Sequence, residues 1–217
     1  MEFHNGLLVA LADVLTSNNS DNIQKRLALA LTKIEEIISS QMACYIILLD
    51  ALVKAASSEN GASLAAVFRA KAKLPENRYA MAQYPGVLEC LANIISSNSY
   101  SYKDRENAMR SIVHLSNANA NRRLMTNRIV LDMLVKSASI TKVEEASIRD
   151  SAITALQRIA TDIPNRKIMA RHDGLIVAIA KATERESKIE RPRSHSYKDQ
   201  AQKHLAKPLL MSLLLEL

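Results

Sequence analysis

One short phrase recurs along the chain at a fixed spacing, which few architectures can accommodate. An Asn-Arg pair occurs at positions 77, 121 and 165, and a methionine follows four residues after each asparagine, at Met81, Met125 and Met169. Both steps are 44 residues long. Spacings of about 40 to 47 residues are typical of arrays whose repeats contain two or three helices. The sequence therefore predicts several copies of one helical unit.

The composition also favours helices over a sheet. Hydrophobic residues make up 48% of the 217 residues, aromatic residues only 4%, and the chain contains four glycines and five prolines. So few turn-forming residues cannot supply many hairpins, whereas alanine and straight-chain residues lose little conformational entropy in a helix. We expect an all-α fold.

Each copy of the repeat predicts three helices. The asparagines at 77, 121 and 165 are expected to be N-caps of a short first helix. Gly86 and Gly174 are expected to end that helix, because glycine readily adopts the left-handed conformation of such turns. An apolar second helix follows. A longer third helix aligns in two copies at the same step of 44, pairing Ala108 with Ala152, Met109 with Ile153, Ile112 with Leu156 and Leu115 with Ile159.

The repeats set the predicted organisation of the chain, a single domain over residues 1–217. Full copies are expected over residues 21–58, 59–100, 101–140 and 141–183, with partial copies over 1–20 and 197–217. A charged and polar segment, residues 184–196, separates the copy over 141–183 from the partial copy over 197–217. Its composition predicts an exposed insertion loop. Terminal repeats of such arrays usually have a polar outer face. Because both ends here are apolar, we expect further repeats, a partner or a second copy of the chain to cover them.

No motif in the sequence predicts catalysis. The chain contains no glycine-rich phosphate loop, zinc-protease motif, nucleophile elbow or CxxC pair, and its five histidines are scattered. Cys44 and Cys90 lie in apolar runs and are expected to be buried free thiols of a reducing compartment. The sequence contains no window of 18 apolar residues, so we expect no membrane span. We therefore expect a cytoplasmic or nuclear protein that is not an enzyme and has no cofactor or metal.

The repeat resembles the armadillo family. Three features carry the resemblance: the short helix with Asn-Arg, the glycine turn before an apolar helix, and the Ala-x-x-Ala-Leu-x-x-Ile-Ala phrase of residues 152–160. The resemblance extends over nearly the whole chain. It implies a right-handed superhelix that binds proteins in a concave groove lined by the third helices. Family members that grip extended peptides have Trp and Asn four residues apart on these helices. The matching positions here hold Leu29 and Lys33, Ala66 and Ala70, Arg110 and His114, and Thr154 and Arg158.

These positions predict a basic groove in place of the Trp and Asn ladder. The expected partner-binding residues are Lys33, Arg110, His114 and Arg158, with Lys203 if the last helix keeps the register. The whole chain has a formal net charge of +7. Cations in a groove favour an acidic segment of a partner protein through charge-assisted hydrogen bonds.

Three alternatives to this reading remain open at the level of the sequence. Nucleic-acid binding through the phosphates is one, although the groove positions offer no aromatic platform for bases. The others are a structural role in a larger assembly and self-association through the apolar ends.

Overall fold

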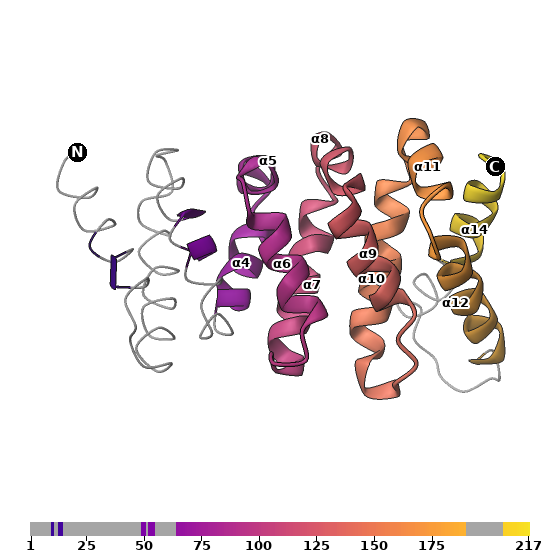
Figure 1. Cartoon of the computed structure of the whole chain (residues 1–217), viewed down its shortest axis with the longest axis horizontal. Helices are drawn as coiled ribbons and strands as arrows, with labels where there is room; N and C mark the ends of the chain where they lie inside the picture. The colour runs from indigo at the N-terminus through magenta and orange to yellow at the C-terminus, as the bar shows by residue number, and fades with distance from the viewer. Residues whose placement is uncertain (1–9, 11–12, 15–48, 51, 55–63, 190–205) are drawn as a thin grey trace. The chain divides into compact units, whose positions relative to one another are not determined.

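The computed structural model describes residues 10, 13–14, 49–50, 52–54, 64–189 and 206–217 (Figure 1). Every regular element within this part of the chain is helical, which confirms the all-α prediction there. None of the helices described has both the length and the apolar character needed to cross a membrane.

The chain divides into two compact units, residues 1–115 and 116–217, and each is described by itself. The elements of the first unit are α4 (Leu64–Lys73), α5 (Pro75–Gln83), α6 (Val87–Ser96) and α7 (Tyr102–Leu115). Those of the second are α8 (Asn119–Arg122), η2 (Leu124–Thr126), α9 (Arg128–Ala138), η3 (Val143–Glu145), α10 (Ala146–Ile159), α11 (Ile163–Ala170), α12 (Leu175–Ile189) and α14 (Ala206–Leu214). The division after residue 115 falls within the copy predicted over residues 101–140 and so does not follow the predicted repeat boundaries. The single domain stays a prediction.

The helix boundaries recur with the period of the sequence. The short first helices α5, α8 and α11 begin at residues 75, 119 and 163, which are steps of 44. The third helices α7 and α10 begin and end 44 residues apart. In the middle copy the short element is broken into α8 and the 3-10 helix η2. The predicted three-helix copies are thus confirmed within the described residues, whereas the right-handed superhelix stays a prediction.

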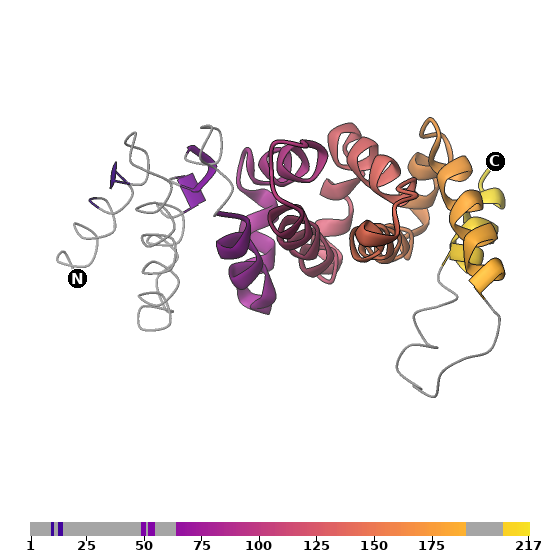
Figure 2. The same cartoon turned by 90° about the horizontal axis from the view of Figure 1, so that it is seen from below.

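The apolar residues that recur every 44 positions lie in the core of each unit. The eight residues paired across the two third helices are all 4% exposed or less, and the three repeated methionines are fully buried. In the first unit α7 packs against α4 and α6, and α4 and α7 lie side by side in Figure 2. In the second unit α9 packs against α10 and α12, and α12 packs against α14. Complete burial of each large apolar side chain contributes about 1.5 to 3 kcal/mol.

Glycine turns join the first and second helices, as predicted. Gly86 has φ 87° and Gly174 has φ 75°, both in the left-handed region. A Cβ atom at Gly86 would lie 2.9 Å from Val53 Cγ1, whereas one at Gly174 would lie 3.6 Å from Val135 Cγ1. Gly86 is therefore required by its backbone and by a close neighbour, and Gly174 by its backbone alone.

The prediction that the repeated asparagines are N-caps is wrong. Each asparagine stands at the third position of its helix, and the N-cap residues are Leu74, Ala118 and Asp162. The side chain of Asn165 donates from Nδ2 to the carbonyl of Ile159 at 3.0 Å, and that of Asn77 donates to the carbonyl of Lys71 at 3.5 Å. The last carbonyls of a helix lack intrahelical partners. These asparagines therefore cap the end of the helix before their own.

The predicted insertion loop over 184–196 is also corrected. Helix α12 continues to Ile189, so the first six residues of that segment are helical. Glutamate, lysine and arginine are good helix formers, and Arg185 Nη1 donates to the carbonyl of Ile140 at 2.9 Å. Residues 190–196 lie outside the described part of the chain, as do nearly all of the copies predicted over 1–20 and 21–58.

Candidate partner-binding surface

The predicted groove residues that the structure describes lie on the two third helices. Arg110 and His114 are on α7 of the first unit, Arg158 is on α10 of the second, and all three are half-buried. His114 and Arg158 are 44 residues apart and share one position of the repeat. Arg110 stands one turn before His114, where α10 has Thr154. Lys33 and Lys203 lie outside the described residues.

Arg110 is bound to a carboxylate of its own helix. Its Nη2 lies 2.7 Å from Oε1 of Glu106, and Lys103 Nζ lies 3.0 Å from Oε2 of the same group. Glu106 is only 6% exposed, so its carboxylate has lost most of its hydration. Two cations at helical spacing compensate this loss. The cluster keeps a single net positive charge, and the Arg110 side chain remains 40% exposed.

The inner side of α7 is fixed against α4 by a polar contact. Arg69 Nη1 donates to Oδ1 of Asn107 at 3.1 Å, and Asn107 is buried. One turn later, Ser111 Oγ donates to the carbonyl of Asn107 at 3.0 Å. These bonds add to the apolar packing of α7 and determine which side chains face outward, among them Arg110.

Helix α10 has an uncharged residue at the position that matches Arg110. Thr154 is uncharged, and its Oγ1 donates to the carbonyl of Asp150 at 2.9 Å. Asp150 is exposed, and its carboxylate lies 3.1 Å from Nε of Arg149. Arg158 is thus the predicted groove cation on α10, and it stands one turn after Thr154.

The sequence analysis missed the role of Glu106. A lysine three residues before it and an arginine four residues after it are the detectable signal, because these spacings bring side chains together on a helix. The burial of Glu106 results from the packing of the helices, and no sequence pattern predicts it. The basic character expected at Arg110 is therefore partly offset.

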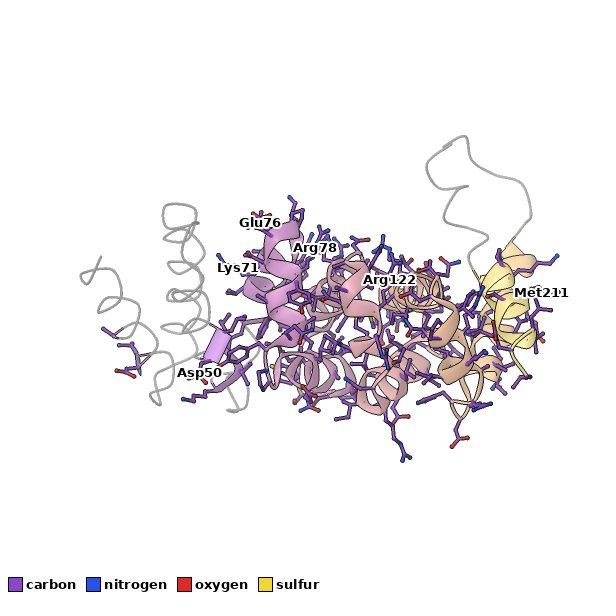
Figure 3. All side chains as sticks on the ribbon, turned by 90° about the horizontal axis from the view of Figure 1, so that it is seen from above. Asp50, Lys71, Glu76, Arg78, Arg122 and Met211 are labelled. Carbon is purple, nitrogen blue, oxygen red and sulfur yellow. The ribbon has the colours of Figure 1, made fainter. Side chains whose placement is uncertain are left out.

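The arginines of the repeated Asn-Arg pairs have a structural role. Arg78 donates to the carbonyls of Ala72 and Lys73 at 3.0 and 2.8 Å, at the end of α4 (Figure 3). Arg122 donates from Nε to the carbonyl of Ser116 at 3.3 Å and from Nη1 to Thr161 Oγ1 at 2.6 Å. In the first two pairs the arginine thus secures the end of the preceding helix, whereas Arg166 of the third pair donates from Nη1 to Ser212 Oγ at 3.2 Å. These contacts explain the recurrence of the pair by structure, without a chemical site.

Besides Glu106, two titratable groups are buried in the described part of the chain, and neither belongs to the predicted groove. Lys71, near the end of α4, is 3% exposed, and burial lowers its pKa to about 8. Burial, with a smaller effect of Glu89, raises the pKa of the Cys90 thiol to about 12, which keeps it protonated and unreactive. The predicted burial of Cys90 is confirmed, and Cys44 lies outside the described residues.

Polar clusters in the described residues do not form a metal centre. No group of three or more His, Cys, Asp or Glu side chains there is arranged to hold a metal ion. His172, beside the second glycine turn, lies with Nε2 at 3.2 Å from Asp132 Oδ1 and Nδ1 at 3.2 Å from the carbonyl of Asp173. Its contacts are those of a residue that secures the turn between α11 and α12.

No protein family model matches the chain, and no curated protein matches it either.

Proposed function

We propose that the chain is an armadillo-like helical repeat protein that binds an acidic segment of another protein through the basic groove predicted along the solvent-facing sides of its third helices, called the third-helix faces below. Two features support this proposal: helix boundaries that recur every 44 residues, and cationic side chains on the same helix of successive copies. The protein acts as a right-handed superhelical scaffold, without a cofactor, in the cytoplasm or nucleus.

The shared position of His114 and Arg158 is the observation that carries the proposal. Both residues are half-buried, so part of each side chain is open to solvent. A guanidinium forms strong charge-assisted hydrogen bonds with carboxylates. Arg110 adds to this on α7, because the hydrogen bond from its Nη2 to Glu106 orients the guanidinium. A pre-oriented cation loses less entropy on binding.

The proposal is tested by neutralising the two arginines together. We expect Arg110→Gln with Arg158→Gln to reduce capture of acidic partners from cell extract about tenfold or more, because a lost charge-assisted pair costs roughly 1.5 to 3 kcal/mol. Capture by the full chain is quantified by mass spectrometry, and circular dichroism verifies the helix content. Glutamine is chosen at 110 because glutamate there would face the buried Glu106.

A matched control removes the same charge elsewhere. Lys142→Gln with Lys181→Gln changes two exposed lysines outside the third helices and should leave capture unchanged. Undiminished capture by the arginine variant would exclude the third-helix faces. It would direct attention to the exposed apolar side chains of the last helix and the residues after it, Met211, Leu214, Leu215 and Leu217. Loss of partners after nuclease treatment of the extract would instead favour nucleic-acid binding.

A further inference from the structure

Helix α11 exposes two isoleucines next to two cations. Ile163 is 57% exposed and Ile168 is 46% exposed. Lys167 and Arg171 are exposed as well, Arg171 at the C-cap. Lys167 stands four residues after Ile163, and Arg171 stands four residues after Lys167 and three after Ile168, which are the spacings that bring side chains together on a helix surface. These four residues are called the α11 face below.

The α11 face differs from the same positions in the other copies. Inward residues of the short helix recur, since Asn165 and Met169 match the residues 44 and 88 positions before them. The outward residues do not. Ile163 stands where the earlier copies have Pro75 and Asn119, and Ile168 stands where they have Ala80 and Leu124. Because the other copies form the short element without this isoleucine pair, folding of the repeat does not require it.

The charge on this part of the surface is positive. Helix α11 contains no acidic residue. Asp162, just before the helix, lies 3.6 Å from Nη1 of Arg122, which offsets its charge. Asp173 follows the helix in the exposed turn and is the nearest acid along the chain on that side. An apolar pair with cations beside it is complementary to a ligand that has apolar and acidic residues on one face.

We propose that the α11 face docks a short acidic amphipathic helix of a partner protein. Apolar side chains of that helix cover Ile163 and Ile168, and its carboxylates pair with Lys167 and Arg171. In such docking the apolar residues of the bound helix are themselves spaced three and four apart. The surface is small, so the affinity is micromolar or weaker. The inference does not depend on the third-helix faces.

The experiment uses a synthetic probe and the full chain. The probe is a fluorescent peptide of about 16 residues, long enough to form a helix on binding, with leucines along one face and glutamates beside them. Its dissociation constant is measured by fluorescence anisotropy. We expect Ile163→Ser with Ile168→Ser, and separately Lys167→Glu with Arg171→Glu, to weaken binding about tenfold or more, which is roughly 1.4 kcal/mol.

Three controls separate docking from general attraction. Arg123→Glu with Lys142→Glu reverses two exposed cations of the same unit outside α11, and it should change the affinity far less. Arg110→Gln with Arg158→Gln should leave it unchanged, so failure of the proposed function and failure of this inference are distinguishable. A probe with lysines in place of its glutamates should prefer the Lys167→Glu, Arg171→Glu variant.

Three outcomes would overturn the inference. Equal losses for the α11 variants and the Arg123→Glu, Lys142→Glu control would show nonspecific electrostatic attraction. Unchanged binding by both α11 variants would show that the peptide binds elsewhere on the protein. Binding to vesicles of phosphatidylserine and phosphatidylcholine that requires the α11 face, without binding of the peptide, would identify a lipid surface as the occupant. Circular dichroism of each variant verifies that the helices are intact.

Discussion

The ammonium group of Lys71 is buried near the end of α4. Burial removes the hydration of the charged form and lowers the pKa of Lys71 to about 8. The same helix end receives hydrogen bonds from the side chains of Asn77 and Arg78. From the sequence alone, a lysine in the last turn of a helix is expected to be exposed to solvent. Its burial depends on residues that arrive from α5, which a reading of α4 alone does not reveal.

We expect Lys71 to make the stability depend on pH above about 8. The unfolded lysine has a pKa near 10.5, so between these values the unfolded chain binds more protons and the free energy of unfolding rises with pH. The shift corresponds to a gain on the order of 1 to 3 kcal/mol. Lys71→Met should be more stable than the wild type at pH 7 by a similar amount, and the difference should shrink toward pH 10.

Urea denaturation at several pH values measures this difference. Lys73→Met, at an exposed lysine two residues away, is the matched control and should track the wild type at every pH. A Lys71→Met variant that is less stable than the wild type at pH 7 would mean that the ammonium group makes a net favourable contribution in its site.

The turns between the first and second helices illustrate what a pattern of elements can and cannot predict. Gly86 and Gly174 were identified by their recurrence, and both adopt the left-handed conformation. The helix starts were misplaced by three residues. Pro75 occupies the first turn of α5, where a missing N–H has no cost, so that helix begins before Asn77. Asparagine is itself a favourable N-cap residue, so local propensity alone does not decide whether the helix begins at Pro75 or after Asn77.

Alanine substitutions at the two turns should differ in cost. Gly174→Ala should lower the free energy of unfolding by about 1 to 2 kcal/mol, because alanine is strained at positive φ. Gly86→Ala should cost more, since its Cβ would also lie 2.9 Å from Val53 Cγ1. Chemical denaturation of both variants measures the order. Adding Val53→Ala to Gly86→Ala should recover only the steric part, and a Gly86→Ala variant no less stable than Gly174→Ala would contradict the packing argument.

For the whole molecule, the period of 44 residues predicted the helical fold and the positions of the third helices, because a recurring apolar pattern must be buried in a recurring way. The candidate site was less predictable. Arg110 and Arg158 were chosen by position, but the buried Glu106 beside Arg110 and the Arg69 to Asn107 bond arise from packing between helices. The exposure of Ile163 and Ile168 likewise needed the structure, since isoleucines in a helix are expected in the core.

Repeats that contact mainly their neighbours should confine the effect of a core cavity. Leu156→Ala, at a fully buried site of α10, should cost about 2 to 5 kcal/mol. Hydrogen exchange should accelerate more in residues 116–217 than in residues 64–115. Ile112→Ala, at the matching position of α7, should show the reverse. Equal acceleration of all helices in both variants would indicate one cooperative unit in place of two.

The capping contacts of the Asn-Arg pairs have a genetic consequence. The Asn77 and Asn165 caps, like the backward bonds of Arg78 and Arg122, reach only five or six residues back along the chain. An in-frame duplication or deletion of one 44-residue segment would therefore carry its own helix end, cap and turn with it. Arrays of this kind can lengthen or shorten by unequal recombination, because the same connection between a third helix and the next first helix is formed again. The outward residues of each copy, such as those of the α11 face, are then free to diverge.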